Sequence, residues 1–110
     1  MRYFLFDQRS DINRVGVTTV GAERMYCTNI YSTNYYVIRN YDYKVFLFRV
    51  GVEHLDAVKR LRAACGRIES HVLVSAEDER SVLYELDCDK DLDVHVHFDG
   101  SVEDVLVEIF

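Results

Sequence analysis

Residues 52–65 read VEHLDAVKRLRAAC, and this stretch carries the clearest structural signal in the chain. Its apolar residues recur at helical spacing and make one face: Val52, Leu55, Val58, Leu61 and Cys65. Acidic residues lie in its first turn and basic residues lie toward its end, which suits the helix dipole. Gly66 follows and can adopt the left-handed conformation that ends a helix. The sequence therefore predicts a helix over residues 52–65.

Segments on both sides of this helix are typical of β-strands, because β-branched and aromatic residues dominate them. The nearest candidates are residues 43–50 before the helix and residues 68–74 after it. Further candidates are residues 2–7, 15–20, 35–39, 82–88 and 92–98. The last two would form a hairpin across the turn Asp89-Lys90-Asp91, with residues 82–88 alternating at period two.

Two segments admit a second interpretation. Ser75 and Asp78 match a capping box, which would start a short helix in place of the strand over residues 82–88. Residues 101–110 fit either a helix capped by Ser101 or a final strand. With 110 residues, the chain has the length of one domain spanning residues 1–110. We expect an α+β fold: an antiparallel sheet of about five to seven strands, with the main helix over residues 52–65 packed on one face.

Charge and composition limit the class of partner. Residues 1–50 carry a net charge of +3 and residues 51–110 carry −9, for a total of −6. This sign argues against direct nucleic-acid binding and against anionic membranes, and it favours a basic protein partner. No apolar run approaches the length of a membrane span, and the N-terminal run is too short for a signal peptide, so we expect a cytoplasmic protein. The three cysteines lack metal-ligand spacing, and no cofactor is expected.

Polar residues near the C-terminus fall on one parity and would share one face of an extended strand. They are Asp87, Asp89, Asp91, Asp93, His95, His97 and Asp99. Their spacing would be roughly 6.6 Å, which is similar to the separation of phosphates along a nucleic-acid strand. The ladder therefore predicts a partner-binding face that mimics a phosphate backbone.

Two other groups of residues are candidates for function. His95 and His97 could share a metal ion with a carboxylate. A further ligand would have to come from elsewhere in the chain, where His54 and His71 are available, and we expect no metal. A tyrosine-rich segment could form a second binding surface, since tyrosine is enriched at interfaces. Its members are Tyr26, Tyr31, Tyr35, Tyr36 and Tyr41.

No motif of nucleophilic catalysis or phosphate binding is present in the sequence, so we expect a protein that is not an enzyme. The favoured hypothesis is an acidic binding module that blocks a basic, nucleic-acid-handling protein, as immunity proteins and phage inhibitors do. A metal-dependent phosphoesterase or nucleotide-processing enzyme that uses His95 and His97 is the first alternative. A self-associating structural subunit, such as a homodimer joined through strand edges, is the second.

Overall fold

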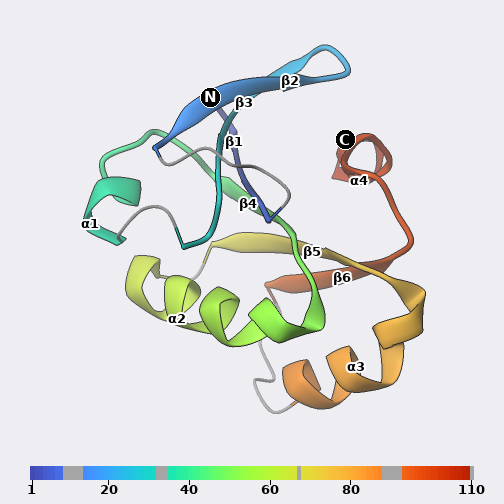
Figure 1. Cartoon of the computed structure of the whole chain (residues 1–110). Helices are drawn as coiled ribbons and strands as arrows, with labels where there is room; N and C mark the ends of the chain where they lie inside the picture. Colours follow the sequence, from blue (N-terminus) through green and yellow to red (C-terminus); the bar gives the residue numbers. More distant parts are fainter. Residues whose placement is uncertain (9–13, 32–34, 67, 88–92, 110) are drawn as a thin grey trace.

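The computed structural model of the chain describes residues 1–8, 14–31, 35–66, 68–87 and 93–109. These residues form one six-stranded mixed sheet and four α-helices in an α+β arrangement (Figure 1). The strands are β1 (Tyr3–Asp7), β2 (Gly16–Val20), β3 (Glu23–Thr28), β4 (Val45–Arg49), β5 (Glu69–Val74) and β6 (Val94–Phe98). The α-helices are α1 (Tyr35–Ile38), α2 (Leu55–Cys65), α3 (Glu79–Asp87) and α4 (Val102–Ile109). Two 3₁₀ turns, η1 (Val52–His54) and η2 (Ala76–Asp78), precede α2 and α3.

The sheet is mostly parallel, and the expectation of an antiparallel sheet is wrong. Its strand order is β2-β3-β1-β4-β5-β6, and only the β2–β3 pair is antiparallel. Parallel neighbours need a crossover connection, which α2 provides between β4 and β5 and α3 provides between β5 and β6. The central strands β1 and β4 are buried on both faces, so they read as continuous apolar runs.

Each face of the sheet has its own apolar core. The first core packs α1, α2 and α3 against the sheet, and Phe4, Phe6, Phe46 and Phe48 lie at its centre. The second core lies on the opposite face, where α4 packs through Val102, Val105 and Leu106. A single main helix therefore does not describe the fold, because helices cover both faces.

The helix expected over residues 52–65 is confirmed as η1 followed by α2, with Leu55 and Leu61 fully buried. The strand expected over residues 82–88 is wrong, because residues 79–87 form α3. The Ser75 side chain accepts a hydrogen bond from the amide of Glu77 and caps η2, the turn that precedes α3. Val82 is buried whereas Tyr84 is 74% exposed, so these two residues do not share one strand face. The strand expected over residues 35–39 is also wrong, since residues 35–38 form α1.

The C-terminal segment is helical, as one of its two interpretations proposed. Ser101 and Asp104 form a reciprocal capping box: Ser101 Oγ accepts from the amide of Asp104, and the Asp104 carboxylate accepts from the amide of Ser101. Their distances are both 3.2 Å. In the part of the chain that the structure describes, no helix has the length and apolar character required to cross a membrane.

Candidate functional site

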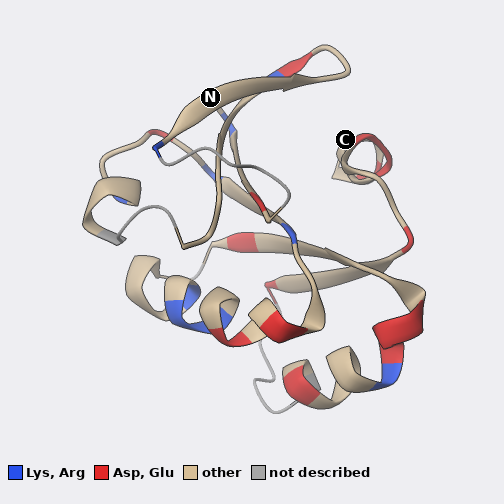
Figure 2. Ribbon diagram, in the orientation of Figure 1, with Lys and Arg blue, Asp and Glu red and all other residues tan. Residues whose placement is uncertain are grey.

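Acidic residues gather on three parts of the fold: the η2–α3 segment on one face of the sheet, β6 with its flanks, and α4 on the opposite face. We call this region the acidic half (Figure 2). Among the described residues from 76 to 109, its acids are Glu77, Asp78, Glu79, Glu85, Asp87, Asp93, Asp99, Glu103, Asp104 and Glu108. Arg80 is the one Lys or Arg in the same described ranges. Most of these carboxylates are exposed, so the strong negative field of the sequence is presented to solvent.

The ladder expected along one strand is interrupted. Asp87 is the last residue of α3, and β6 begins only at Val94. Asp89 and Asp91 lie outside the described residues. Asp99 has a φ of 56° in the turn after β6, and its carboxylate accepts a hydrogen bond from the amide of Ala76. The exposed acids are therefore spread over two helices and a strand, and do not form a single row.

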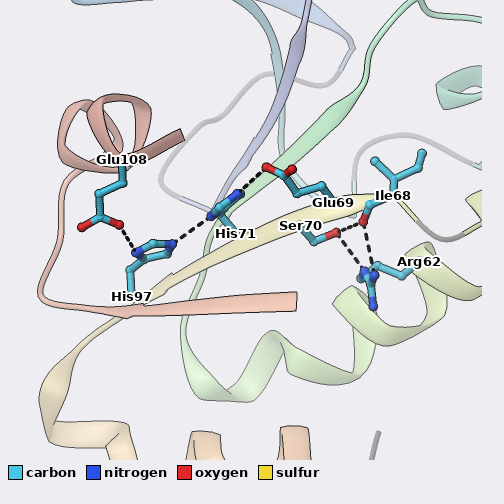
Figure 3. A network of polar contacts seen from close by, with 7 residues as sticks. All are labelled: Arg62, Ile68, Glu69, Ser70, His71, His97 and Glu108. Carbon is cyan, nitrogen blue, oxygen red and sulfur yellow. Dashed lines mark hydrogen bonds and ion pairs between the residues drawn. The ribbon is translucent and has the colours of Figure 1, made fainter. Parts of the chain in front are cut away.

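His97 belongs to a chain of polar contacts on the face of the sheet that α4 covers (Figure 3). Its Nε2 lies 2.9 Å from Nδ1 of His71, which β5 contributes. Nε2 of His71 lies 2.8 Å from the carboxylate of Glu69. At the other end, Nδ1 of His97 lies 3.4 Å from the carboxylate of Glu108 on α4. Two carboxylates thus bracket two imidazoles, and the four residues link β5, β6 and α4.

A third imidazole packs on this chain. The ring of His95 stacks on that of His71, with 4.8 Å between centroids, and His97 stacks on His71 at 5.1 Å. Burial lowers the pKa of His97, the neighbouring His71 and His95 lower it further, and Glu108 opposes them. At neutral pH the half-buried His97 therefore favours its uncharged form.

The metal-dependent alternative requires His95 and His97 to meet further ligands. The structure places the Nε2 of His97 in the contact with His71 and leaves His95 exposed. Across the described ranges, no group of three or more His, Cys, Asp or Glu side chains is arranged so that it could hold a metal ion.

A second polar constellation lies at the carboxyl ends of the parallel strands, the edge where ligands bind in open α/β sheets. Asp7 ends β1 and forms an ion pair with Arg49, which ends the neighbouring β4. Beside Arg49, a cavity of about 480 Å³ opens over the ends of β4, β5 and β6. Its polar lining comes from Arg49, Ser75, Asp99, Ser101 and Asp104. Since Asp99 and Asp104 already accept backbone hydrogen bonds, much of this lining is internally satisfied.

The tyrosines proposed as a second surface include both packed and exposed residues. Tyr26 and Tyr41 pack against each other at 4.8 Å and against the first core. Tyr31 is 58% exposed, and its hydroxyl lies 2.9 Å from Nδ1 of His54. Tyr36 is 77% exposed on α1, while the side chain of Tyr35 is outside the description. Tyr31 and Tyr36 are therefore the exposed members of this set among the described side chains.

Sequence reasoning named His71 as an available ligand but did not place it beside His97, and it missed Glu69 as the partner of His71 and Arg49 as the partner of Asp7. His71 and His97 are 26 residues apart, and only the parallel β5–β6 pairing brings them together. An ionisable residue inside the strand expected over residues 68–74 was the available signal, because such a residue needs a partner when it is buried.

Comparisons with known proteins add no functional assignment. A scan against protein-family models, a search of curated proteins and a search of solved structures each found no match to this chain.

Proposed function

We propose that this chain is an acidic, non-catalytic binding module, and that its acidic half binds a basic surface on a protein that handles nucleic acids. The observation that carries the proposal is the concentration of exposed carboxylates on η2–α3, β6 and α4, where Arg80 is the one Lys or Arg within the described part of residues 76–109. A surface of one sign attracts a partner of the opposite sign and accelerates the encounter. Proteins that bind nucleic acids carry such basic surfaces for phosphates, which carboxylates can imitate in charge.

Exposed apolar side chains on the same elements support a protein partner over a small ion. Tyr84 and Leu83 on α3 are 74% and 45% exposed, and Val107 on α4 is 76% exposed. Interfaces combine a desolvated centre, often built around tyrosine, with a polar rim. Carboxylates would steer the encounter, and the exposed apolar side chains of α3 or of α4, which lie on opposite faces of the sheet, would supply contact area.

The test neutralises three exposed acids of the acidic half without changing their shape: Glu77→Gln, Glu79→Gln and Glu103→Gln together. A partner is first captured from cell extract at low salt and purified, and its association rate is then measured at low and physiological salt. We expect the triple variant to associate roughly tenfold more slowly at low salt, with a flatter salt dependence, because steering is weakened.

A matched control removes three exposed acids elsewhere on the molecule: Asp42→Asn, Glu53→Gln and Asp56→Asn. Both triple variants carry the same net charge, so the control should retain most of the wild-type rate. Equal slowing in the two variants would reduce the effect to net charge alone, and unchanged rates in the first variant would contradict the proposal.

A further inference from the structure

The polar chain Glu69–His71–His97–Glu108 has a protonation pattern that can be derived from one end to the other (Figure 3). An ionised carboxylate only accepts hydrogen bonds, so the 2.8 Å contact with Glu69 requires a proton on Nε2 of His71. In the neutral ring, Nδ1 of His71 then carries a lone pair. The 2.9 Å contact between the rings therefore requires that Nε2 of His97 donates to Nδ1 of His71.

This pattern leaves Nδ1 of a neutral His97 without a proton, facing the carboxylate of Glu108 at 3.4 Å. Two acceptors then oppose each other, and the contact contributes no attraction. One additional proton on Nδ1 of His97 converts the same contact into an ion pair between β6 and α4. Glu69, rather than Glu108, sets the direction of hydrogen-bond donation in this polar chain. Its contact is the shorter of the two, and its side chain is 44% exposed against 66% for Glu108.

The surroundings restrict when that proton arrives. His71 is 6% exposed and its ring lies between those of His95 and His97, so added positive charge there is poorly solvated. From β1, the fully buried Tyr3 faces this region, and Glu69 together with burial raises the pKa of its hydroxyl, which therefore stays neutral. The charged and titratable groups around His97 are thus Glu69 and His71 on β5, His95 on β6 and Glu108 on α4.

We propose that His97 is a proton sensor that joins α4 to the sheet: Glu69 sets the tautomers of both rings, and protonation of Nδ1 creates the ion pair with Glu108. The inference goes beyond the proposed function and does not depend on any partner. The ion pair is a pH-dependent contact on the face of β5 and β6 that α4 covers, and it is absent while His97 is uncharged.

The experiment uses nitrogen-15 NMR of the histidine rings in the full chain, which distinguishes the two tautomers and the protonated form. At neutral pH we expect protons on Nε2 of both His71 and His97. Upon acidification, Nδ1 of His97 should gain a proton with a midpoint below the ordinary 6.5, because burial and the neighbouring imidazoles disfavour the charge. A neutral His97 that already carries its proton on Nδ1 would overturn the proposal.

Two matched variants test the direction of the chain. In Glu69→Ala, the carboxylate of Glu108 is the one that remains in the polar chain. The rings of His71 and His97 should then both carry their protons on Nδ1 at neutral pH, with His97 donating to Glu108. Glu108→Ala should keep the wild-type tautomers and lower the midpoint of His97 by about a few tenths of a pH unit. Glu103→Gln, on the exposed side of α4, serves as the control and should change neither property. Unchanged tautomers in Glu69→Ala would refute the assignment of Glu69 as the group that sets them.

The same contact predicts the sign of a pH effect on stability. The folded state binds the His97 proton less readily than the unfolded chain, because the pKa of His97 is lowered. Its stabilising contribution is therefore complete above the ordinary pKa of 6.5 and is lost as the pH falls through the lowered value. Urea unfolding between about pH 5 and pH 8 should show stability declining on the acid side. His97→Gln should flatten that decline, and an equally steep decline in this variant would exclude His97 as its source.

Discussion

Replacing Phe46 by alanine is expected to lower the free energy of unfolding by about 3–5 kcal/mol. Phe46 is fully buried in the middle of β4 and stacks on Tyr43 at 4.9 Å. Its ring also meets those of Phe6 and Phe48, at 5.4 Å and 5.7 Å between centroids. The substitution removes the buried area of a large ring and leaves a cavity lined by rigid aromatic neighbours that can collapse only partly.

Urea unfolding followed by circular dichroism measures this loss, and Tyr36→Ala is the matched control. Tyr36 is an aromatic residue of similar size but is 77% exposed, so its removal should change stability by less than about 1 kcal/mol. Similar losses in the two variants would mean that Phe46 does not occupy the core position described for it. Since a small domain has only about 5–15 kcal/mol of stability, the Phe46 variant should be close to unfolding at physiological temperature.

The second large effect is expected at the carboxyl edge of the sheet, where Arg49→Met should cost about 2–3 kcal/mol. Asp7 is 7% exposed, and the Arg49 guanidinium is its ion-pair partner. Without that partner a carboxylate remains buried among apolar strands, and this penalty is larger than the net contribution of the pair. The partial exposure of Arg49 keeps the expected cost below that of a fully buried pair.

A double variant, Asp7→Leu with Arg49→Met, separates the two contributions. Because the buried charge is then absent, the double variant should be more stable than Arg49→Met alone. The deficit of Arg49→Met should also shrink on acidification, as the buried carboxyl group of Asp7 takes up a proton. A double variant less stable than either single one would show that the pair itself, and not the stranded charge, carries the stability.

Much of the secondary structure follows from local pattern, and the helix over residues 52–65 is the clearest instance. Its five apolar residues fit the helical period and not the strand period, and the structure confirms the helix. The segment 82–88 satisfied two periods at once, because Val82 and Leu86 are spaced as neighbours on a helix and also share strand parity. If this segment is interpreted as a hairpin arm, no crossover helix connects β5 and β6, and the pattern then predicts an antiparallel sheet.

The candidate site could be predicted from the sequence only in part. The alternation of residues 94–98 places His95 and His97 on one face, and the structure places them on β6. Their partners come from β5 and α4, and no local pattern specifies which strand lies beside β6. The role of the acidic half as a partner-binding surface remains a prediction, because charge alone does not specify what it contacts.

The position of β1 has a consequence for the order of folding. β1 precedes the other described strands in the sequence, and both of its neighbours, β3 and β4, follow it. Phe4 pairs with Tyr26 on one side and with Phe46 on the other, so β1 stays unpaired on the second side until residues 45–49 are available. Such distant pairings make folding slow, because a long loop must close before its contacts are gained. During this interval the apolar run Tyr3–Phe6 has the composition of an aggregation-prone segment, and the pairing of β4 with β1 then protects it.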